Sequence, residues 1–177
     1  GGRIASVVDI KVKSPYTDQF KLEGGIGVIS SKLSLSTPII KDKLMLLAGG
    51  RIGFTDFLFP LLIPRLKNTK ANFTDSTIKL LYLLNERNQF TYTHFFSHDF
   101  YQLDLISSIE NIVSSSNQFD FGTSNHTLRW LHGFQNDTNL VGTFVQSNYL
   151  PQNLFPEVDS SNVIRFQSQI QYTSAQF

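Results

Sequence analysis

The sequence predicts an all-β protein whose antiparallel strands form part of a transmembrane β-barrel. Apolar and polar residues alternate with a period of two, helical periodicity is nearly absent, and short turns alternate with long connections. No run approaches the roughly 18 apolar residues of a membrane helix. The longest, residues 57–63, is short and broken by Pro60. Hydrophobicity that is weak in each segment is typical of barrel strands, whose side chains alternate between lipid and lumen.

The composition excludes several functions for this chain. Its 177 residues suffice for one ordinary domain, and a net charge of +1 gives no reason to expect nucleic acid as a partner. The absence of cysteine excludes disulfides, thiolate metal ligands and a cysteine nucleophile. Charged residues are sparse, whereas aromatic residues are frequent. Those near predicted strand ends could form the aromatic girdles of a membrane protein: Phe54, Phe90, Phe100 and Tyr172.

The predicted strands are runs in which apolar residues occupy alternate positions. After Phe20, the apolar parity reverses near Gly27, which predicts a tight hairpin because a slip of one residue exchanges the two faces. The clearest strand covers residues 44–55. The weakest prediction covers residues 140–149, where apolar residues divide between both faces. Further strands are expected near 77–84, 90–100, 127–132 and 164–172.

The connections between these strands follow a regular rhythm. This alternation favours an outer-membrane barrel over a soluble sandwich, in which loop lengths are mixed. Strands of about ten residues also suit a tilted membrane crossing. We expect the long connections to face the outside, with apolar residues 57–63 packed on neighbouring loops or on a partner protein. Short turns are expected at 41–43, 85–88 and 135–138, and long connections at 57–72, 101–118 and 150–162.

One predicted face is rich in polar side chains and would line a water-filled lumen. Charges on a lumen wall are well solvated, whereas facing lipid near the midplane they would cost roughly 2–4 kcal/mol. Their role would be contact with a plug or with passing substrate, and the alternative is a simple solvated wall. The candidate residues are Arg51, Lys79, Asp99, Arg129, Arg165, Gln167 and Gln169.

The sequence contains no pattern that predicts catalysis or a metal site. His94 and His98 share a strand face but stand roughly 13 Å apart, which is too far for one ion. His126 and His132 are expected to be isolated. No serine lies in a Gly-x-Ser-x-Gly motif, and the acidic residues are too scattered for glycoside hydrolysis. We therefore expect neither an enzyme nor a bound cofactor.

The first residues, GGRIASVVDIKVK at 1–13, resemble the last plug strand of TonB-dependent outer-membrane receptors, in particular the large Bacteroidetes-type receptors. The segment IGVISSKLSLSTPI at 26–39 is similar to the first barrel hairpin of that family, and LLAGGR at 46–51 to the next strand. Thr37 departs from the glycine common at that position. By this resemblance the residues of the plug-terminal strand include Gly1, Gly2, Arg3 and Asp9.

The resemblance implies that residues 1–17 end a plug domain and that residues 18–177 begin the barrel. The chain would be a fragment with about eight of the 22 strands of such transporters, without a TonB box or the rest of the plug. It would belong to the outer membrane of a Gram-negative bacterium, in contact with outer-membrane lipid. The implied function is energy-coupled uptake of a siderophore, glycan, peptide or cobalamin. The implied partners are TonB, this small ligand and a surface lipoprotein.

Two alternatives to transport remain open at this point. The first is an outer-membrane scaffold or secretion component that reuses the receptor fold. The second is a soluble β-sandwich that binds glycan through exposed aromatic side chains. Two edges cut from a large barrel would lack partners, so we expect the missing strands to be supplied elsewhere in the full protein or assembly.

Overall fold

The structure is a computed structural model that describes residues 12–55, 61, 69–103, 107–109, 112–114, 116–156 and 163–177. All secondary-structure elements in these ranges are β-strands, which confirms the predicted all-β class. No helix in the same ranges is both long and apolar enough to cross a membrane. Residues Gly1, Gly2, Arg3 and Asp9 of the predicted plug strand lie outside the described residues. Val12 and Lys13, at the end of that predicted strand, are described and lie outside the strands.

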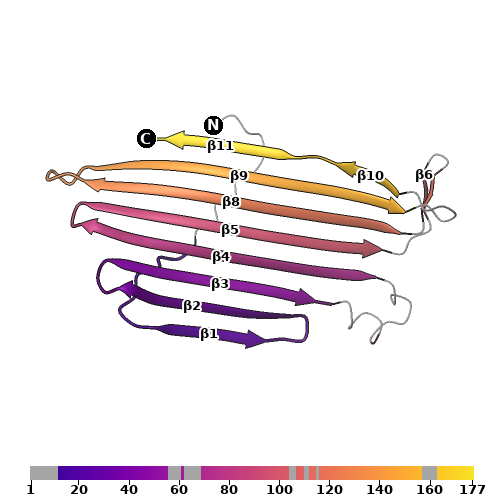
Figure 1. Ribbon diagram of the computed structural model, residues 1–177, viewed down its shortest axis with the longest axis horizontal. Helices are drawn as coiled ribbons and strands as arrows, with labels where there is room; N and C mark the ends of the chain where they lie inside the picture. Colours follow the sequence, from indigo (N-terminus) through magenta and orange to yellow (C-terminus); the bar gives the residue numbers. More distant parts are fainter. Residues whose placement is uncertain are drawn as a thin grey trace.

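Nine of the described strands form one antiparallel sheet whose spatial order follows the sequence (Figure 1). β1 lies at one edge, and β10 and β11 both pair with β9 at the other, so the described strands form an open sheet. The nine strands are β1 (Lys21–Ile26), β2 (Ser30–Ile40), β3 (Leu44–Phe54), β4 (Lys70–Asn85), β5 (Asn88–Leu103), β8 (Asn117–Gly133), β9 (Asn139–Pro156), β10 (Val163–Gln167) and β11 (Ile170–Gln176). A separate hairpin consists of β6 (Ser107–Ile109) and β7 (Ile112–Ser114).

The connections confirm the predicted alternation of short turns and long loops. Turns of two to five residues join β2 to β3, β4 to β5 and β8 to β9 at one end of the strands, here called the turn end (Figure 1). The long connections lie between β3 and β4, between β5 and β8, and between β9 and β10, at the opposite or loop end. The connections longer than five residues between described strands of the sheet therefore lie at the loop end, which also carries the short turn between β1 and β2.

The hairpin predicted near Gly27 is also confirmed. Residues 27–29 join β1 to β2 at the loop end, and the Gly27 amide donates to the Ser30 carbonyl at 2.9 Å. At the turn end, Asp42 and Asp137 adopt positive φ angles of 56° and 58°. Aspartate tolerates this left-handed conformation better than most residues do, because its short side chain can bond locally.

The four central strands are longer than predicted. β4 and β5 contain 16 residues each, β8 contains 17 and β9 contains 18, against the expected ten or so. The long connections are correspondingly shorter, and β9 continues to Pro156 through much of the connection predicted at 150–162. Nearly half of the added residues are Asn, Gln, Ser or Thr, which interrupt the alternation in hydropathy that marks a strand in sequence.

Pro151 lies inside β9 and accounts for the interruption between β10 and β11. The Ser168 amide donates to the Pro151 carbonyl at 3.1 Å, so the two residues form a hydrogen-bonded pair of the ladder. Proline has no N–H to return the second bond. The registers on either side, Gln167 with Gln152 and Ile170 with Tyr149, are continuous. β10 and β11 therefore occupy one position at the sheet edge.

The register defines two faces of the sheet, because directly opposite residues of a ladder share a face. Lys79 pairs with Leu47 and Thr93, and this side is called the Lys79 face. Trp130 pairs with Phe90 and Gly142, and this side is called the Trp130 face. The few buried apolar side chains of the described residues lie on the Lys79 face: Met45, Leu47 and Leu81.

Candidate functional site

The register splits the seven candidate lumen residues between the two faces. Arg51, Lys79, Asp99 and Arg129 share the Lys79 face, as predicted. Arg165, Gln167 and Gln169 lie on the Trp130 face, so the expectation that all seven share one face is wrong. Arg165 pairs with Leu154 and Gln167 with Gln152, and Gln169 donates to Asn148 at 3.1 Å. These partners in β9 all belong to the Trp130 face.

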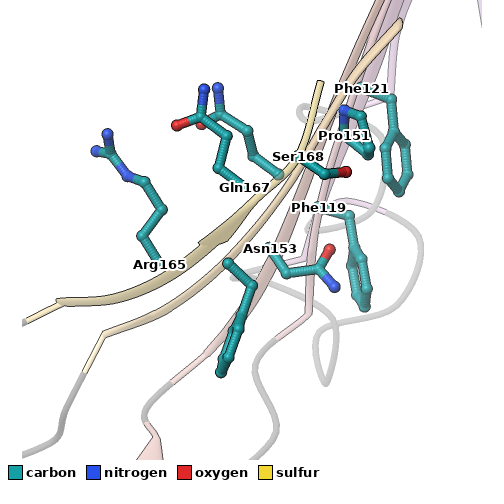
Figure 2. Close-up of a pocket in the computed structure, with 9 residues that line it drawn as sticks. Phe119, Phe121, Pro151, Asn153, Arg165, Gln167 and Ser168 are labelled. Atoms are coloured by element: carbon teal, nitrogen blue, oxygen red, sulfur yellow. The ribbon is translucent and has the colours of Figure 1, made fainter. Parts of the chain in front are cut away.

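Figure 2 shows this separation directly. Arg165 and Gln167 project to one side of the strands, whereas Phe119 and Phe121 project to the other. The sequence correctly predicted that Tyr172 and the glutamines of the last strand lie on different faces. Tyr172 pairs with Ser147, which belongs to the Lys79 face. The two groups were assigned to the wrong faces of the sheet, because alternation within one strand does not show which face each group shares with the neighbouring strands. Tyr172 consequently lies on the Lys79 face, opposite the face that carries Phe54, Phe90 and Phe100.

Arg51 is held by an ion pair on the Lys79 face. Its guanidinium contacts the Asp75 carboxylate through Nε at 2.8 Å and through a terminal nitrogen at 2.7 Å. The Arg51 Cζ also lies 4.8 Å from the centroid of the Phe73 ring, in a cation–π contact. The Phe73 ring packs closely over Gly53, which supplies the space for it. Cross-strand pairing between β3 and β4 therefore fixes the position of Arg51.

Lys79 binds the segment that precedes β1. Its Nζ donates to the carbonyl oxygens of Val12 at 2.8 Å and Lys13 at 3.3 Å. Residues 12–17, here called the strap, thus lie against the Lys79 face, with Pro15 and Thr17 buried. Arg129 stands on the same face and repels Lys79 electrostatically. Of the four predicted residues on this face, Lys79 is the one that contacts the strap.

An aromatic row crosses the Lys79 face near the loop end. Tyr101, Phe119, Phe121 and Tyr149 follow one another with ring centroids 6.5, 6.2 and 6.4 Å apart. Beside Phe119 and Phe121, an open depression of about 470 Å³ is also lined by Asn153 and Phe166, among other residues (Figure 2). Half-exposed rings interspersed with amide side chains offer stacking surfaces and hydrogen bonds to a ligand. These four aromatic residues were not predicted from the sequence as a group.

The Trp130 face carries an apolar aromatic cluster at the turn end. Trp130 stacks with Phe90 at 6.4 Å between centroids, and its indole donates to the Asn88 side-chain oxygen at 3.1 Å. His132 lies within hydrogen-bonding distance of the same oxygen, at 2.9 Å, and meets the Phe134 ring edge-on. Rings with an apolar body and a satisfied polar tip are typical of a membrane interface.

Two of the histidines predicted as isolated or interfacial form a cross-strand pair on the Trp130 face. His94 and His126 stack with ring centroids 4.4 Å apart, and His126 Nδ1 lies 2.8 Å from the Tyr92 hydroxyl. The prediction that His126 is isolated is therefore wrong, as it is for His132. His98 contacts Asp120 at 2.8 Å, a partner that sequence reasoning missed. These pairs are invisible in sequence because a long connection separates β5 from β8.

No group of three or more potential metal ligands occurs among the described residues. The contacts of the Lys79 face thus comprise an ion pair, a lysine-bound strap and an aromatic row, whereas the Trp130 face combines an apolar band with polar and histidine-rich residues. Comparison of the chain with protein-family models, with curated proteins and with solved structures found no match. Functional inference therefore rests on the geometry of these two faces.

Proposed function

We propose that the chain is part of a TonB-dependent outer-membrane transporter, with residues 18–177 in its barrel wall and residues 1–17 at the end of its plug. The observation that carries this proposal is the opposed chemistry of the two faces of one sheet. Apolar and aromatic side chains dominate the Trp130 face at the turn end, and Arg, Lys, Asp and Thr are frequent on the Lys79 face. Lipid would cover the first face, and the lumen would lie on the second.

The apolar region of the Trp130 face forms an oblique band. In β3 this side is apolar as far as Phe54 at the loop end, whereas β4 becomes polar beyond Ile78 and β8 beyond Leu128. In β3, β4 and β8 the boundary thus moves toward the turn end, whereas β5 carries Phe96 and Phe100 beyond it on the same face. Barrel strands tilt by about 35–45° from the membrane normal, so a horizontal hydrocarbon layer crosses successive strands at different residues. An oblique boundary supports such a tilted wall.

The strand lengths fit a wall that rises beyond the membrane. A tilted crossing takes about 9–11 residues, and β4, β5, β8 and β9 are 16–18 residues long. Beyond the apolar band, the Trp130 face carries side chains suited to the polar outer surface, including Arg165, Gln167 and Gln169. Their place in the transporter would be the outer wall above the hydrocarbon layer and not the lumen.

The two open edges of the sheet favour the presence of further pairing strands in the complete protein. β1 is exposed along its whole length, and Leu22 and Ile26 are 57% and 92% exposed. An edge strand with unpaired backbone groups and apolar side chains is prone to aggregate unless another strand covers it. In this proposal further barrel strands pair with β1 and with β10 and β11. The transported ligand would meet the aromatic row on the lumen side.

Two adjacent residues of β8 provide a matched test of the membrane wall. Leu128 lies on the Trp130 face, opposite Tyr92 and Phe144, and Thr127 lies on the Lys79 face, opposite Thr93. In the complete protein without other cysteines, we expect Leu128→Cys to resist a water-soluble maleimide and to react with a membrane-partitioning one. Thr127→Cys is the control and should react with the water-soluble reagent. Equal water-soluble labelling at both positions would favour the soluble β-sandwich instead.

A second measurement separates transport from a scaffold with the same wall. The complete purified protein is expected to bind the purified carboxyl-terminal domain of TonB, measured by surface plasmon resonance, because energy reaches a transporter through TonB. Membrane insertion without TonB binding would favour the outer-membrane scaffold or secretion component. No covalent chemistry is part of the proposed mechanism, in which the plug rearranges when it is pulled.

A further inference from the structure

We infer that Lys79 is a positioning residue that latches the strap, residues 12–17, onto the sheet. The inference concerns a contact between two parts of this chain, and it stands whether or not the sheet belongs to a transporter. If it does, the latch would join the end of the plug to the wall at β4. Failure of the latch and failure of the proposed function are therefore separate outcomes.

The hydrogen bonds of the strap create the need for such a residue. Val12 and Lys13 lie outside the strands, so no neighbouring strand of the ladder satisfies their carbonyl groups. Val12 is partly buried, and a partly buried backbone carbonyl requires a donor, whereas Lys13 is exposed. One ammonium group serves both, at 2.8 and 3.3 Å. Bonds from a charged donor are stronger than bonds between neutral groups.

The surroundings of Lys79 make this contact more than a surface bond. Its register neighbour Leu47 is 6% exposed, and Leu81, two residues along β4, is 4% exposed. Met45, opposite Leu81, is 1% exposed, which is unusual for a side chain on a single sheet. The Lys79 side chain thus passes beside a strip of buried apolar neighbours before its ammonium reaches the strap.

A lysine at position 79 is suited to this contact because its side chain is long enough to reach the strap and its ammonium is a charged donor. The lysine stem can run along the apolar strip while its ammonium reaches the strap. Methionine keeps a stem of similar length and removes the donors, whereas arginine keeps both charge and donors. Arg129 offers a matched control, since it carries a neighbouring charge on the same face and bonds no strap residue in the described part of the chain.

The test measures tryptic cleavage after Lys13 in the complete protein, in detergent micelles, followed by mass spectrometry of the fragments. Lys79→Met is expected to raise the initial cleavage rate about tenfold, because strap opening becomes easier by the loss of charged hydrogen bonds. Lys79→Arg should stay within about twofold of the parent protein. Arg129→Met should also stay near the parent rate.

Folding is checked in the same samples by far-ultraviolet circular dichroism, which detects the β-sheet whether or not it belongs to a barrel. The latch is supported if Lys79→Met opens the Lys13 site while its spectrum stays that of the parent protein. If the Lys79→Met rate equals the parent rate, the assignment is overturned. An equal rise in Arg129→Met would overturn it as well, because removal of a charge on this face would then suffice. A Lys79→Met protein with an altered spectrum is replaced by Lys79→Gln, which is judged by the same criteria.

Discussion

Among the glycines in the described part of the chain, Gly53 has the least room for a side chain. A Cβ built there would lie 2.2 Å from Phe73 Cε1, and that ring also receives the Arg51 guanidinium. We therefore expect Gly53→Ala to destabilise the folded protein by about 1–3 kcal/mol through overpacking. The measurement is the thermal midpoint of the complete protein in detergent, followed by the heat-dependent gel shift.

Gly122 supplies the matched control for this substitution. It also lies within a long strand, but its Cβ would meet Leu150 Cβ at 3.9 Å, which is ordinary contact. Gly122→Ala is expected to leave the midpoint unchanged or to raise it slightly, because alanine lowers the entropy of the unfolded chain. A Gly53→Ala protein as stable as Gly122→Ala would show that the Phe73 ring can move aside without cost.

Single residues also show how far the sequence allows prediction of the candidate site. Arg51, Lys79, Asp99 and Arg129 were placed on one face correctly, because each lies in a strand with clear alternation. Arg165 was placed on the wrong face, since alternation groups residues within a strand but does not orient that strand against its neighbours. Contacts such as that of His98 with Asp120 depend on the register across a long connection. No local signal encodes that register.

At the scale of elements, most strands of the main sheet and their ends at the turn end could be predicted, but the ends at the loop end and the hairpin of β6 and β7 could not. The turns near 41–43, 85–88 and 135–138 were found because turn residues interrupt the alternation there. At the loop end, β9 continues to Pro156 with polar residues on both faces, so the hydropathy pattern gives no boundary. Pro151 favoured a loop in the sequence. The strand accommodates Pro151 because the N–H that proline lacks would have bonded Ser168, which lies in the interruption between β10 and β11.

This account of Pro151 makes a prediction about β10 and β11. Pro151→Val restores an N–H opposite Ser168, so the two short strands are expected to join into one continuous strand. Hydrogen exchange by mass spectrometry should then show slower exchange in the peptide that contains Ser168 and Gln169. As a control, exchange in β4 should be unchanged. Unaltered exchange at Ser168 and Gln169 would mean that the interruption has a cause other than the missing donor.

At the scale of the whole molecule, two asymmetries support the proposed membrane wall. The connections longer than five residues between described strands of the sheet lie at one end, and side-chain chemistry separates the two faces of the sheet. A soluble sheet needs one apolar face, but it does not need its long connections gathered at one end. An outer-membrane wall needs both, because one end meets the periplasm and the other meets the outside. Together the asymmetries assign an orientation to the proposed transporter.

That orientation can be tested with an epitope tag at each end of the sheet. A tag between Asp159 and Ser160, in the connection that follows β9, is expected to bind antibody on intact cells, because long connections face the outside. A tag between Asn136 and Asp137, in the turn between β8 and β9, should bind antibody only after the outer membrane is permeabilised. If antibody bound intact cells only through the tag in the turn, the orientation would be the reverse of the one proposed. If antibody bound both tags equally on intact cells, the membrane wall would be contradicted. Flow cytometry of intact and permeabilised cells that express the complete protein provides the measurement, with a periplasmic protein as the permeability control.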